Sequence, residues 1–110
     1  METTLALSAL SALAHDLRLQ VFRQLVVAGP EGMAAGAIAE TLGIRANTLS
    51  NNLTILAQAR LIRSQREGRS VRYFADMDGF RALLGFLMRD CCDGRTELCQ
   101  PLIDELACSC

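Results

Sequence analysis

The chain has 110 residues and a formal net charge of −1, with no tryptophan and one tyrosine. This length allows one domain with a small hydrophobic core. No run of about twenty consecutive apolar residues occurs, and no positive charge precedes the apolar N-terminal stretch, so we expect no membrane span, no signal peptide and a cytoplasmic location.

The first part of the chain has the spacing of helices. Residues 3–28 carry an apolar stripe at helical intervals that comprises Leu10, Leu13, Leu17, Val21 and Leu25. Asp16 is a good N-cap residue, so we expect a second helix to begin there after a short break. The segment Gly29-Pro30-Glu31-Gly32 then predicts a turn.

A helix-turn-helix is predicted next. A short helix runs from Ala35 to Leu42 and ends at Gly43, and a second helix runs from Thr48 to Ala59 with its leucines facing inward. The residues predicted to be exposed on this second helix are short and polar: Asn47, Thr48, Ser50, Asn51, Asn52 and Thr54. Such side chains suit hydrogen bonding to base edges in the major groove, whereas an ordinary solvated helix carries more Glu, Lys and Gln.

From Leu61 the apolar period changes to two. Residues 61–66 and 70–75 flank the turn Glu67-Gly68-Arg69, which predicts a β-hairpin. A hairpin with arginines directly after a helix-turn-helix is typical of a wing that contacts the DNA backbone or the minor groove.

Positive charge is concentrated in this same region. Residues 45–72 contain six arginines and one glutamate, a local charge of +5, and the rest of the chain therefore carries −6. By composition alone, such a block indicates either a polyanionic partner or a solvated face. Together with the helix-turn-helix and the wing it favours DNA, and the cations that we expect to contact DNA are Arg45, Arg66, Arg69 and Arg72.

Asp76 or Asp78 is expected to cap a final helix that runs to about Cys91 and is apolar nearly all round. Such a helix needs a cover, either the N-terminal helix or the same helix of a second subunit. We therefore expect a mainly α fold with a β-hairpin, a dimeric winged helix-turn-helix. Residues 1–93 form the DNA-binding and dimerisation domain, and residues 94–110 form a cysteine-containing extension.

All five cysteines lie in the last twenty residues: Cys91, Cys92, Cys99, Cys108 and Cys110. In the cytoplasm these thiols stay reduced and are available as ligands. His15 is the only histidine, so the cluster offers mainly thiolates, which select soft ions such as trivalent arsenic or antimony. Zinc would prefer a fourth ligand and a closer spacing of cysteines.

Several segments resemble the ArsR/SmtB family of metalloregulatory repressors over roughly residues 9–90. They are Leu13-Ala14-His15-Asp16-Leu17-Arg18-Leu19, Ile38–Ile44 with Thr48–Leu56, and Arg66-Glu67-Gly68-Arg69 with Tyr73. Two departures are Asn51-Asn52, where basic residues or histidine are common, and Arg60, where glycine is frequent.

The resemblance implies a homodimer, formed through the first and last helices, that binds double-stranded operator DNA and leaves it when a metal or metalloid binds. Cys91, Cys92 and Cys99 resemble the C-terminal three-thiol arsenic site of family members. Adjacent helical residues point about 100° apart, so ligation by both Cys91 and Cys92 should distort the last turn. Cys108 and Cys110 stay unassigned.

Two alternatives remain open. One is a redox-sensing repressor of the same fold in which Cys91 or Cys92 forms a disulfide with Cys99. The other is a thiol enzyme or a thiol-based metal carrier, but no His, Asp or Lys constellation is present to activate a nucleophile. We therefore expect a repressor that is not an enzyme, with As(III) or Sb(III) as its inducer and no organic cofactor.

Overall fold

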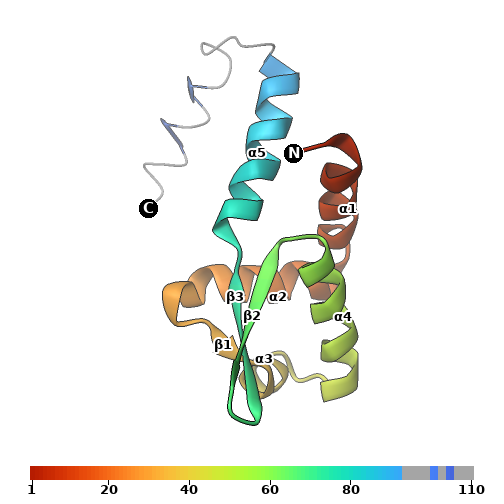
Figure 1. The fold of residues 1–110 in the computed structure, drawn as a ribbon, viewed down its shortest axis with the longest axis vertical. Coiled ribbons are helices and arrows are strands. Elements are labelled where there is room, and N and C mark those ends of the chain that lie inside the picture. The colour runs from red at the N-terminus through yellow and green to blue at the C-terminus, as the bar shows by residue number, and fades with distance from the viewer. Residues whose placement is uncertain (93–99, 102–103, 106–110) are drawn as a thin grey trace.

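The computed structural model describes residues 1–92, 100–101 and 104–105 and has the fold of a winged helix-turn-helix (Figure 1). Its helices are α1 (Thr3–Leu13), α2 (Asp16–Ala28), α3 (Ala35–Leu42), α4 (Ala46–Gln58) and α5 (Met77–Cys92), with a 3₁₀ turn η1 (Gly29–Glu31). Its strands are β1 (Met33–Ala34), β2 (Ile62–Glu67) and β3 (Ser70–Ala75). The predicted fold class is confirmed. The predicted boundary at residues 93 and 94 lies outside the described residues.

The break between α1 and α2 falls at residues 14–15, as predicted, but α1 packs through a different face. Its buried residues are all alanines: Ala6, Ala9 and Ala12. Leu10, which we expected in the buried stripe, is 39% exposed, so that prediction is wrong. Alanines at this face let α1 approach the domain closely, while Leu7 and Leu10 are exposed and Leu13 packs at the edge of the core.

The helix-turn-helix has the predicted turn. Gly43 ends α3 in the left-handed conformation with φ of 66°, and its N–H donates to the carbonyl of Glu40. Helix α4 begins at Ala46, two residues before the predicted start, because Arg45 already has the extended backbone of a residue that precedes a helix.

The wing is part of a three-stranded antiparallel sheet with the order β1-β3-β2. Within the hairpin Ser64 pairs with Tyr73, and on the other edge of β3 the same tyrosine pairs with Met33 of β1. Strand β1 was not predicted from the sequence, because two residues are too few to show a period. The turn before β1 needs Gly32: its φ is 62°, and a Cβ there would collide with the carbonyl of Tyr73 and the ring of Phe74.

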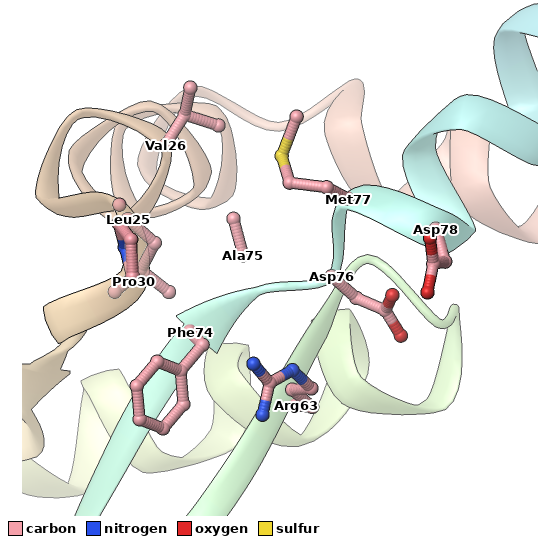
Figure 2. A pocket seen from close by; sticks show the side chains of 10 residues that line it. Leu25, Val26, Pro30, Arg63, Phe74, Ala75, Asp76, Met77 and Asp78 are labelled. Atoms are coloured by element: carbon pink, nitrogen blue, oxygen red, sulfur yellow. The ribbon is translucent and has the colours of Figure 1, made fainter.

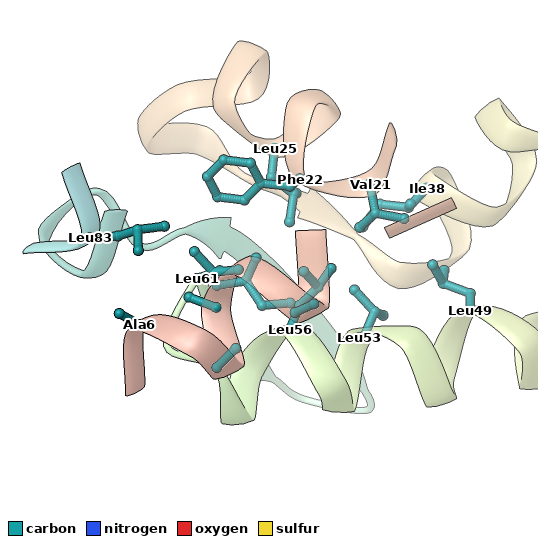
Figure 3. Packing of buried hydrophobic residues seen from close by; sticks show 14 residues of the cluster. Ala6, Val21, Phe22, Leu25, Ile38, Leu49, Leu53, Leu56, Leu61 and Leu83 are labelled. Atoms are coloured by element: carbon teal, nitrogen blue, oxygen red, sulfur yellow. The ribbon is translucent and has the colours of Figure 1, made fainter. Parts of the chain in front are cut away.

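One hydrophobic core joins all five helices (Figure 3). Its largest fully buried side chains are Val21, Leu25, Ile38, Leu49, Leu53, Leu56, Leu61 and Leu83. Figure 3 shows the leucines of α4 pointing toward the side chains of α2, so the buried face of α4 is fixed by this packing.

Helix α5 begins in the core and then leaves the rest of the domain (Figure 1). Asp76 caps it, as predicted, by accepting the N–H of Gly79 on Oδ1 at 3.0 Å. The ring of Phe80 lies 5.1 Å from that of Phe22, and α5 also contacts α1. Among the helices of the described residues, none is long and apolar enough to cross a membrane.

Candidate DNA-binding surface

The outward face of α4 carries most of the polar residues predicted for it. Asn47, Thr48, Ser50, Asn51 and Thr54 are exposed, whereas Leu49, Leu53 and Leu56 are buried on the other side. Amides and hydroxyls on one exposed helix face form donors and acceptors that match base edges in a major groove.

Hydrogen bonds within α4 decide which of these groups stay available. Asn47 Oδ1 accepts the N–H of Thr48 at 2.9 Å, and the hydroxyl of Thr54 donates to the carbonyl of Ser50 at 3.1 Å. Over residues 1–92, the side chain of Asn51 makes no hydrogen bond. Asn51 therefore presents a complete amide outward, the group that binds adenine through two hydrogen bonds.

Asn52 is a correction to the sequence analysis. We predicted it on the exposed face, but it is only 7% exposed, and its amide donates to the carbonyl of Thr48 at 2.8 Å. The spacing contains the reason, since Asn52 follows Leu49 by three residues and precedes Leu56 by four, which places it within the inward stripe. An outward role for Asn52 is therefore withdrawn.

Two of the predicted wing arginines have no hydrogen bond or ion pair to any residue that the structure describes. Arg66 and Arg69 are exposed near the turn of the hairpin, where Gly68 has a φ of 63°. Glu67 and Ser70 pair across this two-residue turn, and positive φ at its first residue is what a type II′ turn requires. The tip therefore holds two cations within a rigid hairpin.

Arg72 has other partners. Its Nη1 donates to the carbonyls of Glu31 at 3.0 Å and Gly32 at 3.4 Å, and its Nε lies 3.3 Å from Oε1 of Glu67. These contacts tie β3 to the segment before β1. Arg72 was predicted to contact DNA, and in this structure its Nη1 and Nε already have partners within the chain.

The remaining cations divide between two ends of the molecule. Arg45 is exposed directly before α4, and Figure 1 shows the start of α4 and the tip of the wing at one end of the molecule, with α5 rising from the other. Arg60 instead lines a hollow with Met1, Leu5 and Gly79, beside α1 and α5. The basic block of the sequence is therefore not one surface, and the arginines at the end with α4 and the wing tip are Arg45, Arg66 and Arg69.

Known proteins share this arrangement. A family model for a helix-turn-helix domain matches residues 13–65. The nodulation protein NolR of Rhizobium meliloti is 31% identical over 86 residues, which are 78% of this chain and 68% of NolR. The solution structure of a homodimeric winged helix-turn-helix DNA-binding domain from Mycobacterium bovis, described as a possible ArsR-family transcriptional regulator, is 28% identical with a TM-score of 0.63 and covers 88% of this chain and 84% of its own.

The chain belongs to the ArsR/SmtB family of transcriptional regulators. An ArsR-like regulator from Rhodococcus sp. RHA1 has the same fold, with a TM-score of 0.73 over 94% of this chain and 93% of its own, at 22% identity. The chain is therefore a DNA-binding transcriptional regulator. We predict that the outward face of α4 and the wing are the surface that contacts DNA.

The structure shows the environment of the two positions at which this chain departs from the family's sequence pattern. Asn51 and Asn52 point in different directions from α4, and Asn51 is exposed whereas Asn52 is buried. Arg60 has a φ of 62°, the left-handed conformation that glycine adopts without strain and that other residues rarely adopt.

The cysteines of the predicted metal site lie at or beyond the end of α5. Cys91 and Cys92 are the last two residues of α5, and their side chains lie outside what the structure describes. Cys99, Cys108 and Cys110 lie outside the described residues altogether. Within residues 1–92, 100–101 and 104–105, no three His, Cys, Asp or Glu side chains are placed to hold a metal ion.

A hollow of about 280 Å³ lies where the wing of this ArsR-family chain meets α2 and α5 (Figure 2). Its walls are mostly apolar, and the guanidinium of Arg63 lies 4.6 Å from the centre of the Phe74 ring. Figure 2 shows Val26 of α2 and Met77 of α5 at the upper rim and Arg63 with Asp76 at the lower one. Arg63 is thus placed at the base of the wing rather than at its tip.

Proposed function

We propose that this regulator is a homodimeric repressor that leaves its operator when trivalent arsenic or antimony binds the thiolates of Cys91, Cys92 and Cys99. The observation that carries the proposal is the position of Cys91 and Cys92 as the last two residues of α5, the helix that contacts α1 and extends away from the DNA-facing end. The named relative is a nodulation protein, so the choice of inducer rests on the cysteines of this chain.

Apolar side chains on α1 and α5 support a homodimer. Leu7 is 61% exposed and Leu10 is 39% exposed on α1, and Leu84 is 36% exposed on α5. Burying such side chains contributes about 25 cal/mol per Å² of apolar surface. A second copy of α1 and α5 is a self-complementary cover for these leucines, and the Mycobacterium bovis domain is homodimeric.

A dimer places two α4 helices against one duplex in the cytoplasm. Dimeric helix-turn-helix proteins read half-sites about one helical turn apart, roughly 34 Å. A small rotation of one subunit against the other changes that separation and lowers the affinity. Any event that alters α5 therefore acts on DNA binding through the dimer.

Cysteine chemistry supports arsenic or antimony. Three thiolates favour a soft trivalent ion. Side chains of adjacent helical residues point about 100° apart, so Cys91 and Cys92 meet on one ion only when the last turn of α5 is distorted. Binding therefore costs helical structure at the end of α5 and pulls on the dimer-forming helix, which is the proposed signal for release.

The test measures binding of the protein to a labelled promoter fragment, taken from upstream of the gene that encodes it, by fluorescence anisotropy. Arsenite, antimonite, zinc or cadmium is added in reducing buffer. We expect release by arsenite and antimonite. The variant with Cys91, Cys92 and Cys99 all changed to Ser should bind the fragment and ignore arsenite. The variant with Cys108→Ser and Cys110→Ser is the matched control and should respond like the wild type. Release of the triple variant by arsenite would show that the site is elsewhere.

The same cysteines support the alternative of a redox-sensing repressor, in which Cys91 or Cys92 forms a disulfide with Cys99. Release by hydrogen peroxide that dithiothreitol reverses, without release by arsenite in reducing buffer, would favour this alternative. Titration of free thiols before and after peroxide then identifies the pair.

A further inference from the structure

Asn52 and Arg18 form a partly buried polar link between helices. The Nη1 of Arg18 donates to Oδ1 of Asn52 at 3.4 Å, and the Nε of the same guanidinium donates to the carbonyl of Ala12 at 2.8 Å. Ala12 belongs to α1, Arg18 to α2 and Asn52 to α4. One guanidinium therefore connects three helices.

Both groups that accept hydrogen bonds from Arg18 have an oxygen available for a donor from another helix. The carbonyl of Ala12 lies in the last turn of α1, where carbonyls have no partner within the helix. Asn52 uses its amide nitrogen on the carbonyl of Thr48, which leaves its oxygen for a donor from outside α4. Arg18 supplies donors to both groups from a rigid, planar fork.

Hydrophobic packing does not account for an amide at this position. Leu49, Leu53 and Leu56 around it are buried and apolar, so a further leucine would continue the stripe. Asn is a weaker helix former than Leu, and a buried amide needs its hydrogen bonds. Among the described residues, Asn52 is the one polar residue in the buried class. In some helical proteins a buried polar group of this kind selects one arrangement of helices among several of similar packing.

We propose that Asn52 and Arg18 set the orientation of the recognition helix α4 relative to α1, so that Asn52 is a positioning residue for DNA binding. The inference rests on the proposed homodimer, since α1 is one of its two contacting helices. The angle between α1 and α4 then determines how far apart the two recognition helices stand. Asn51 contacts DNA from the outer face of α4, and Asn52 acts from the inner face.

The test compares variants at these two neighbouring positions. Asn52→Leu removes the link and keeps a side chain of similar size, while Asn51→Leu changes the exposed neighbour. Asn52→Asp keeps an acceptor for Arg18, with a stronger, charge-assisted hydrogen bond, and Arg18→Gln removes the guanidinium. The probe is a duplex of about 30 base pairs, enough for two half-sites, that the wild-type protein selects from a random library. A scrambled duplex of equal length reports non-specific binding.

We expect Asn52→Leu to melt within a few degrees of the wild type, to stay dimeric, and to lose affinity for the selected duplex by about tenfold or more. Its affinity for the scrambled duplex should not change, since the wing cations are intact. Asn52→Asp keeps the acceptor for Arg18 but loses the donor to the carbonyl of Thr48, so it should regain part of the lost affinity. Arg18→Gln should reproduce the loss, and adding Asn52→Leu to it should cause little further loss, because both remove one contact.

The outcomes separate this inference from the proposed function. A wild-type protein that selects no duplex overturns both. A wild-type protein that binds, with a folded Asn52→Leu variant that binds equally well, leaves the proposed function standing and shows that Asn52 only fills the core. If Asn52→Leu does not fold, Arg18→Gln decides: unchanged affinity for the selected duplex overturns the link. Equal losses in Asn52→Leu and Asn52→Asp overturn the role of Arg18. Asn51→Leu should lose selected binding without any coupling to Arg18→Gln.

Discussion

The backbone carbonyl of Arg60 lies against Gly79 so closely that no Cβ fits between them. Arg60 follows the recognition helix α4, and Gly79 lies in the first turn of α5. The N–H of Asp76 also donates to the carbonyl of Leu61 at 2.8 Å. The short segment that follows α4 is therefore in direct backbone contact with the beginning of α5, the helix that ends at Cys91 and Cys92.

This contact predicts that Gly79→Ala destabilises the protein. A methyl group at position 79 meets a backbone carbonyl that cannot turn away, and overpacking of this kind costs about 1–3 kcal/mol. Urea denaturation followed by circular dichroism, at one protein concentration for all variants, measures the change. Gly36→Ala is the matched control, because a Cβ at position 36 meets nothing within 4 Å; it should be neutral or stabilising by up to about 1 kcal/mol. Equal stability of the two variants would contradict the close approach.

Arg60→Gly is expected to stabilise the fold. A non-glycine residue in the left-handed region costs of order 1 kcal/mol, and glycine at φ of 62° relieves it. Since Arg60 lies beside residues of α1 and α5, the affinity for DNA should stay the same. The measurements are urea denaturation and anisotropy with the selected duplex. Weaker DNA binding by Arg60→Gly would place this arginine on the DNA after all.

Arg66→Gln and Arg69→Gln should weaken DNA binding about equally for all sequences. Each removes one exposed cation at the wing tip, so the slope of log affinity against log salt should fall by about one per substitution. Anisotropy at several salt concentrations measures the slope.

Arg72→Gln is expected to act on the fold instead. It removes the hydrogen bonds to the carbonyls of Glu31 and Gly32, each of which contributes about 1 kcal/mol or more because the donor is charged. The unfolding midpoint should fall, and the salt slope should stay near that of the wild type. A lower salt slope with unchanged stability would indicate that Arg72 contacts DNA, as the sequence predicted.

Leu7→Glu should convert the dimer to a monomer. The carboxylate would face its symmetry-related neighbour on the apolar surface of α1, and losing burial of a leucine on both subunits weakens association by about tenfold or more. Sedimentation velocity measures the state of association. Val27→Glu is the control, since Val27 is 87% exposed on α2; that variant should stay dimeric. Dimers of Leu7→Glu as stable as those of the wild type would exclude α1 from the interface.

Local patterns were sufficient for most of the fold. The break before Asp16, the glycine at position 43, the hairpin around Gly68 and the cap at Asp76 all depend on residues close together in the chain. Their dihedral preferences and short-range hydrogen bonds act wherever those residues occur. Strand β1 was not predicted, because two residues show no apolar period. It forms as a strand by pairing with the edge of β3.

The hydrogen-bond partners of single polar side chains depended on segments that are distant in the sequence. Nothing in Arg72 itself distinguishes it from Arg69; Arg72 is bound because the carbonyls of Glu31 and Gly32, about forty positions earlier, face it across β1 and β3. Asn52 is turned inward with its amide bonded to a guanidinium from α2. Amino-acid types and spacing sufficed to predict a winged helix-turn-helix with a basic, polar reading surface, because helix and strand periods are local properties. The partner of each polar group was settled only by folding, because hydrogen bonds between distant segments form after packing has brought those segments within about 3 Å of each other.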